Sequence, residues 1–242
     1  MRKLLCIALL SACGVANAIP NINIGAMYEF IDGEKSTLSK RVRNQGDQTG
    51  YVRTEVSEII YLNDGKKQER KIDAQAAAKG NVDGLIFTPS RMIIPAKGMQ
   101  TGRLIVTGQR DKERYYRVRF IPVMPKDQYE FNQSKTEFDD YRKKLNAGVN
   151  VLTGYGAMVI VRPKNQEFNT QIENTEKSVL IKNRGNSSIA IEAAKQCVNN
   201  KCQDEKGTIL LPGKDYRILK KSNHSMQFNL LEGSKKTPKL FG

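Results

Sequence analysis

The chain has few of the residues that enzymes commonly use for catalysis. It contains one histidine, His224, which lies in a polar turn with Ser222. A hydroxyl–imidazole pair also needs an orienting carboxylate and an oxyanion hole, and no motif for either flanks this turn. The adjacent carboxylates Asp139 and Asp140 fall in a polar stretch, where we expect both to be solvated. No glycine-rich phosphate-binding loop is present, so we predict that the protein is not an enzyme.

Cysteine is scarce as well. Two of the four cysteines, Cys6 and Cys13, fall within the first 18 residues, which leaves Cys197 and Cys202 for the rest of the chain. No histidine or further cysteine lies near this pair to complete four ligands, so the sequence predicts no metal site. Export to an oxidising compartment would favour a disulfide between Cys197 and Cys202 over two free thiols. The closed loop is short, so the expected stabilisation is about 2 kcal/mol.

Long apolar runs are lacking beyond the N-terminus, and none there is long enough to span a bilayer. The N-terminus itself has the three parts of a secretory signal peptide. These are a positive end at residues 1–3, an apolar core at Leu4–Leu10 and an A-x-A cleavage site at Ala16–Ala18. We therefore predict a signal peptide over residues 1–18, a mature chain that begins at Ile19, and export as a soluble protein.

Acidic residues are outnumbered by basic ones. The chain has 40 lysines and arginines against 25 aspartates and glutamates, and removal of the signal peptide would leave a net charge of +13. Such a field favours anionic partners. An exported protein rarely meets nucleic acid, so acidic partner proteins or a membrane surface fit better. The plain alternative is a solvated basic surface that keeps the chain soluble.

Short β patterns separated by turn signals recur along the chain, and helical patterns are nearly absent. The β patterns lie at residues 22–31, 36–44, 51–62, 84–88, 92–94, 103–107, 114–121, 179–182, 189–193, 208–211, 216–219 and 226–230. In the seventh, Tyr116, Val118 and Phe120 are expected to face inward. Many short strands at even spacing predict an all-β protein. The polar segment Lys164–Thr170 indicates a hinge, so we predict two β-sandwich domains, residues 19–164 and 165–242.

The longest uncharged, β-rich run after the leader is Gly148–Pro163, which follows the polar linker Lys126–Asn146. Its second half is apolar on both faces, as in a strand buried on both sides. Its first half alternates, with Val149, Val151 and Thr153 on one face, and predicts an edge strand with an apolar row left over. Such an edge invites another chain to pair with it. The alternative is an ordinary core strand of a sandwich.

The order and spacing of several segments resemble the periplasmic chaperones of the alternate (class 5, alpha) chaperone–usher pilus pathway. The matching segments are Gly84–Pro89, Ile94–Ala96, Glu113–Val118, Ser36–Lys40, Leu180–Asn186 and Pro212–Lys214. Together they cover nearly the whole mature chain. The resemblance implies two immunoglobulin-like β-sandwiches in a boomerang arrangement, a place in the periplasm, and no cofactor.

Members of this family hold pilin subunits whose own sandwich lacks a final strand. They lend the last strand of their first domain to fill the groove, and they deliver the subunit to an outer-membrane usher. The resemblance therefore implies pilins and an usher as partners, and neither nucleic acid nor a small-molecule substrate. It implies donor-strand complementation through Val149, Val151 and Thr153. It also implies an ion pair across the domains between Arg162 and Asp111. An exposed donor edge also allows the free chain to associate with itself.

The sequence departs from the sister pathways at one point. Their chaperones anchor the C-terminal carboxylate of the pilin in the cleft with an arginine and a lysine. Those positions fall here at Tyr28 and Met158, and neither residue is basic. The sequence therefore does not identify the anchor.

Two other functions fit parts of the sequence. An exported structural or adhesive pilus component would share the all-β pattern, but it would carry an extra donor segment or lack a strand. A basic surface-binding protein would be lipid-anchored if Leu10–Cys13, which resembles a bacterial lipobox, were acylated at Cys13. Cleavage there would leave a leader of only 12 residues with little apolar core, which favours soluble export.

Overall fold

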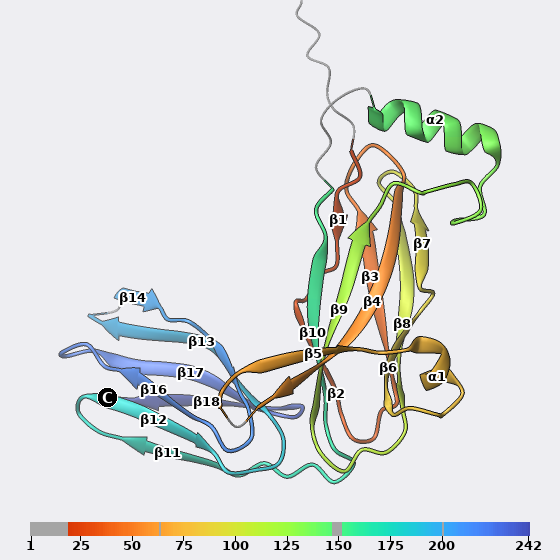
Figure 1. The fold of residues 1–242 in the computed structure, drawn as a ribbon. Coiled ribbons are helices and arrows are strands. Elements are labelled where there is room, and N and C mark those ends of the chain that lie inside the picture. Colours follow the sequence, from red (N-terminus) through yellow and green to blue (C-terminus); the bar gives the residue numbers. More distant parts are fainter. Residues whose placement is uncertain (1–18, 63, 147–151, 200) are drawn as a thin grey trace, which may run out of the picture.

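The computed structural model describes residues 19–62, 64–146, 152–199 and 201–242 (Figure 1). Strands make up most of this part of the chain, and they form two β-sandwiches set at an angle to each other. The prediction of an all-β protein with two sandwiches in a boomerang arrangement is confirmed. None of the helices in these four ranges is long and apolar enough to cross a membrane.

The strands between residues 22 and 161 form the N-terminal sandwich, in which two sheets enclose one apolar core. One sheet has the order β1 (Ile22–Asn23), β3 (Thr37–Asn44), β8 (Met99–Thr107) and β6 (Gly84–Thr88). The other has the order β2 (Tyr28–Ile31), β10 (Tyr155–Val161), β9 (Arg114–Pro122), β4 (Gly50–Tyr61) and β5 (Lys67–Lys71), and β7 (Arg91–Ile94) also pairs with β4. Tyr116, Val118 and Phe120 of β9 are buried as expected.

The strands between residues 170 and 241 form the smaller C-terminal sandwich. One sheet has the order β11 (Thr170–Asn174), β12 (Ser178–Asn183) and β16 (Asp215–Leu219). The other has the order β14 (Lys201–Asp204), β13 (Ile189–Val198), β17 (Ser225–Glu232) and β18 (Lys235–Phe241), and β15 (Thr208–Leu210) also pairs with β13. Cys197 and Cys202 lie opposite each other in the β13–β14 pair and form the predicted disulfide.

Each sandwich contains the same buried asparagine turn, although the sequence shows no evident repeat. Asn44 ends β3 and Asn183 ends β12, and both side chains donate hydrogen bonds to buried backbone carbonyls. Each also accepts a bond from the backbone N–H of the glycine two residues later, Gly46 or Gly185. A Cβ on either glycine would lie 2.0 or 2.3 Å from a backbone oxygen, so only glycine fits there.

The first predicted strand, residues 22–31, is divided between the two sheets of the N-terminal sandwich. β1 pairs with β3 in one sheet, whereas β2 pairs in parallel with β10 in the other. Gly25 lies between them with φ of +67°, a conformation that glycine adopts without a steric cost. The chain therefore crosses from one sheet to the other over a few residues.

The predicted polar linker contains a helix, α2 (Lys135–Asn146), which covers the end of the N-terminal sandwich far from the C-terminal one (Figure 1). Its N-terminus has a capping box, because Ser134 and Glu137 each accept a hydrogen bond from the backbone N–H of the other. The helix is fixed by a small separate core, in which Tyr141 packs edge-on against Tyr51 beside Phe131. The linker is therefore ordered over these residues. The other helix, α1 (Ala74–Ala78), is one short turn formed by the alanine-rich patch.

The docking of α2 predicts different effects for two substitutions of Tyr141. The hydroxyl of this buried residue has no hydrogen-bond partner among the described residues, so Tyr141→Phe should leave the free energy of unfolding unchanged or slightly higher. Tyr141→Ala should lower it by about 3 kcal/mol, because the ring is lost from a packed cluster. Urea unfolding measures both. An equal loss in the two variants would show that the hydroxyl, and not the ring, holds the helix.

Candidate functional site

The edge of β10 is only partly covered. On one side β10 pairs with β9 from Tyr155 to Val161, but on the other side it pairs with β2 only from Met158 onward. The N–H of Met158 donates to the carbonyl of Met27 at 2.8 Å. Because backbone groups alternate along a strand, Gly156 presents its N–H and C=O to the same side, where no described strand continues. The strand edge is therefore open before Met158.

Side chains on β10 alternate between the core and the outside. Tyr155, Ala157 and Val159 pack in or against the core of the N-terminal sandwich. Thr153 has the same parity as Tyr155 and is exposed. The predicted donor residues Val149 and Val151 lie outside the described residues, and the strand begins at Tyr155, later than the sequence predicts.

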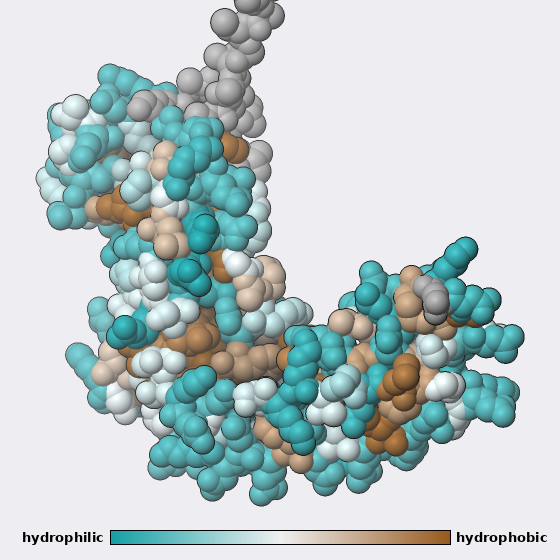
Figure 2. Space-filling view, turned by 180° about the vertical axis from the view of Figure 1, so that it is seen from behind, coloured by the Kyte–Doolittle hydropathy of each residue, from teal (hydrophilic) through white to brown (hydrophobic). Residues whose placement is uncertain are grey.

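The open edge leads into a cleft of about 800 Å³ between the two sandwiches. Met158 lies opposite Tyr28 in the parallel pair, and both side chains line this cleft. Most of the other lining side chains are apolar or aromatic, and they come from both sandwiches: Phe30, Tyr61, Tyr115, Ile160, Ala190, Ile209, Leu211 and Leu231. Figure 2 shows the hydrophobic colouring that gathers at the elbow of the molecule. The cleft can therefore accept an apolar segment.

Two lysines face this cleft from opposite sides. Lys67 belongs to the β4–β5 hairpin, and Lys206 precedes β15 in the C-terminal sandwich. The ammonium of Lys67 lies 5.2 Å from the centre of the Tyr61 ring. Neither lysine makes an ion pair within the part of the chain that the structure describes. They are the cationic groups of the cleft that remain available to an anion.

Arg162 lies at the junction of the sandwiches, but its partner differs from the expected one. Its guanidinium contacts the carboxylate of Asp32 at 2.5 Å and donates to the carbonyl of Ser188 at 3.1 Å. It also stacks over Phe30. Asp111 is exposed and forms no ion pair with Arg162, so the expected Asp111–Arg162 pair is corrected. The β8–β9 loop turns Asp111 outward and directs its neighbour Arg110 into the junction instead.

Arg110 joins three segments through their backbones. Its buried guanidinium donates to the carbonyl of Arg162 at 2.6 and 2.9 Å. It also donates to four carbonyls of the β2–β3 connection, at Ile31, Asp32, Gly33 and Lys35. Burial lowers the pKa of Arg110 from its usual value. This side chain fixes the ends of β2 and β10 relative to each other, and no sequence pattern indicates this role.

Glu113 is the acidic residue that bridges the junction. It accepts hydrogen bonds from the backbone N–H of Ser188 at 2.7 Å, from the hydroxyl of Ser188, and from the hydroxyl of Tyr115 at 2.7 Å. Burial raises the pKa of Glu113, although these bonds and the nearby Arg162 oppose the rise. The junction thus contains a carboxylate that is more readily protonated than an ordinary glutamate.

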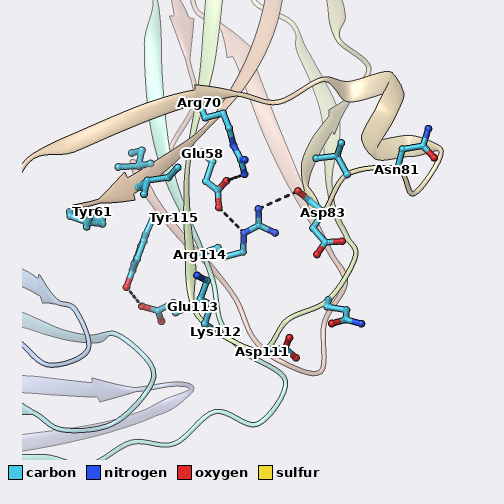
Figure 3. Close-up of a pocket in the computed structure, with 14 residues that line it drawn as sticks. Glu58, Tyr61, Arg70, Asn81, Asp83, Asp111, Lys112, Glu113, Arg114 and Tyr115 are labelled. Atoms are coloured by element: carbon cyan, nitrogen blue, oxygen red, sulfur yellow. Dashed lines mark hydrogen bonds and ion pairs between the residues drawn. The ribbon is translucent and has the colours of Figure 1, made fainter. Parts of the chain in front are cut away.

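A second hollow, of about 870 Å³, lies beside the β4–β5 hairpin (Figure 3). Glu58 is held there between Arg70 at 2.5 Å and Arg114 at 2.7 Å. Burial would raise the pKa of Glu58, but the two arginines outweigh it and lower the pKa. Asp111 also lines this hollow. Glu58, Arg70 and Arg114 therefore neutralise one another and join three strands.

The remaining candidate residues are dispersed. His224 is exposed, and its ring Nδ1 lies 2.7 Å from the carbonyl oxygen of Ser222 in its own turn. Asp139 and Asp140 lie on α2. Over the described ranges, no group of three or more histidine, cysteine, aspartate or glutamate side chains gathers as a metal site would require.

Comparisons with known proteins agree on one class of protein. No protein-family model matches the chain. It is 31% identical over 198 residues to a CS1 fimbrial protein of Escherichia coli, a match that covers 81% of this chain and 76% of that protein. It is 24% identical over 221 residues to the probable fimbrial chaperone EcpB of Escherichia coli O157:H7 (strain EC4115 / EHEC), with 90% and 89% covered. The crystal structure of the class 5 fimbriae chaperone CfaA matches with a TM-score of 0.55 and 20% identity, over 92% of this chain and 99% of that one.

The fold is that of the fimbrial chaperones, with two immunoglobulin-like sandwiches. The likeness to the CS1 fimbrial protein extends this from fold to sequence. The chain belongs to the class 5 family of chaperone–usher pilus chaperones. It is accordingly a periplasmic chaperone that delivers subunits for pilus assembly, as the sequence resemblance implied.

The raised pKa of Glu113 predicts how stability depends on pH. The folded protein binds this proton more readily than the unfolded chain, whose pKa is about 4.5. The stability due to Glu113 is therefore present at low pH and is lost as the pH rises through the folded pKa. Unfolding of wild type and Glu113→Gln should be compared from pH 4 to pH 8, and the wild type should lose stability relative to the variant as the pH rises. Asp111→Asn, which removes an exposed carboxylate of the same loop, is the control. A constant difference between wild type and Glu113→Gln would contradict the assignment.

Proposed function

We propose that β10 and the residues before it are a donor strand that completes the sandwich of a pilin subunit. The observation that supports this most directly is the open edge of β10 before Met158. A strand edge with unpaired N–H and C=O groups pairs readily with another extended segment. We propose that this happens after residues 1–18 have been removed, that an outer-membrane usher receives the subunit, and that no reaction is catalysed.

The side chains that would enter the subunit are Val149, Val151 and Thr153. Alternation from Tyr155 gives these residues one common side of the strand, the side that faces the core of the chaperone at Tyr155. A sandwich without its last strand has an apolar groove of the same spacing. Burial of Val149 and Val151 in that groove would stabilise the complex by about 1.5 to 3 kcal/mol each.

The end of the subunit would lie in the cleft. An incoming strand that pairs with β10 cannot continue past Met158, because β2 occupies the edge from Tyr28 onward. The chain would therefore end or turn at the cleft, where Lys67 and Lys206 have no carboxylate partner among the described residues. Two cations select a C-terminal carboxylate over an amino terminus. We propose that the last strand of the subunit runs parallel to β10 and that these two lysines hold its carboxylate.

Paired substitutions on neighbouring residues test the donor strand. The chain should be co-expressed with the exported pilin-like products encoded beside its gene, and the complexes should be purified and identified by mass spectrometry. A stoichiometric small β-rich partner should be captured by wild type and by Asn150→Asp, whose new charge points to the other side of the strand. It should be lost with Val151→Asp and with the Val149→Asp, Val151→Asp double variant. Capture that survives in the double variant would move the binding site away from this strand.

The cleft lysines are tested with the subunit captured in that experiment. Lys67→Met and Lys206→Met should each weaken its binding about tenfold, as the loss of a charge-assisted bond predicts. Lys66→Met is the matched control, because Lys66 lies in the same hairpin but pairs with Asp64. Binding of a subunit with an amidated C-terminus should be weaker for wild type and insensitive to both cleft substitutions. If the lysine variants weaken the amidated subunit equally, they do not contact its carboxylate.

A further inference from the structure

The crossover between β1 and β2 lies at a point where the chain has two possible partners. In the sheet of β1, Asn23 pairs with Arg43, and the same antiparallel register would place Ala26 opposite Lys40. In the sheet of β2, Tyr28 pairs with Met158, and the same parallel register would place Ala26 opposite Gly156. Ala26 pairs with neither in the structure. Its position therefore decides how far the N-terminal segment extends along β10.

The N-terminal segment is a built-in competitor for the open edge. If the parallel register of β2 continued toward the N-terminus, Ile24 would lie opposite Gly154 and Ile22 opposite Leu152. The edge proposed to receive the subunit would then be covered by the chain itself. Ile22 and Ile24 oppose this, because both side chains are buried in the core on the β3 side. The residues between Ile24 and Tyr28 have no such anchor of their own.

Lys40 supplies a contact to this segment. Its side chain is 3% exposed, and its ammonium donates to the carbonyl of Ala26 at 2.5 Å and to the carboxylate of Glu29 at 2.6 Å. Glu29 belongs to β2, so one buried cation holds both the crossover and the strand that follows it. Buried lysines are rare because an ammonium loses its hydration. An apolar residue would serve the core as well, so the charge calls for another explanation.

The crossover also has room to move. A hollow of about 310 Å³ adjoins it, lined by Asn23, Gly25, Ala26, Glu29 and Lys40 among others. A Cβ at Gly25 would meet no atom within 4 Å. Packing alone therefore does not hold this segment, and the two bonds of Lys40 are its main restraint.

We propose that Lys40 is a positioning residue for subunit capture, which holds the crossover at Ala26 away from β10 and so keeps the donor edge open. The proposal rests on the proposed donor role of β10. Without the bonds of Lys40, the segment before β2 extends its parallel pairing toward Gly156. The subunit then has to displace it before it can bind.

Hydrogen exchange in the free protein tests the crossover without any subunit. In wild type the amide of Gly156 faces the open edge and should exchange rapidly. In Lys40→Met its protection should rise at least threefold, whereas Lys40→Arg, which keeps a cation in reach, should resemble wild type. A merely structural role of Lys40 predicts the opposite sign, because loosening the sandwich lowers protection on β10 and β2 alike. Unchanged or lowered protection at Gly156 overturns the proposal.

Capture kinetics form the second arm. With the subunit identified by co-expression, Lys40→Met should capture it at least threefold more slowly, and Lys40→Arg at the wild-type rate. Glu29→Gln removes only the charge of one acceptor and should give smaller changes of the same sign in both arms, which also serves if Lys40→Met fails to fold. Slower capture without a rise in Gly156 protection overturns the proposal. If Val151→Asp retains the subunit while Gly156 protection rises in Lys40→Met, the donor role fails and the control of the crossover stands alone.

Discussion

The N-terminal segment can satisfy only one strand edge at a time, and the rest of the molecule depends on how it is divided. Its first residues hydrogen-bond to β3, and its last ones to β10. The remainder of the β10 edge therefore has no strand partner among the described residues. Natural edge strands are commonly protected by charges, prolines or bulges. The residues that lead into β10 are Thr153, Gly154 and Tyr155, which offer none of these, and such an edge is an asset only in a protein whose task is to pair with another chain.

The buried charges at the junction give this edge its direction. An unpaired buried charge would be costly, but Arg110 is surrounded by backbone carbonyls, Arg162 by Asp32 and the Ser188 carbonyl, and Glu113 by hydroxyl and amide donors. These bonds connect the ends of β2 and β10 to the first turn of the C-terminal sandwich. The edge therefore ends at the cleft, and a segment paired with β10 has its end between Lys67 and Lys206.

The sequence predicted the features that depend on local alternation and missed those that depend on tertiary contacts. The inward row of β9 and the close cysteine pair followed from spacing alone. Helix α2 was missed although Ser134 and Glu137 form a capping box, because its composition is mostly polar and only a few apolar positions recur at helical spacing. The division of residues 22–31 had one signal, Gly25. The choice of Asp32 over Asp111 had none, since loop carboxylates look alike until packing decides which one is buried.

A pilus chaperone must also release its subunit, and the proposed site is suited to that. Valine and threonine side chains fill less of an apolar groove than leucine or isoleucine would, so each contributes little beyond its own burial. Lys67 and Lys206 are exposed, so solvent and salt weaken their attraction for a carboxylate. Most of the affinity must then come from backbone pairing along the open edge. Any strand can supply backbone pairing, so a subunit strand with larger apolar side chains in the same register would replace β10 without an external energy source.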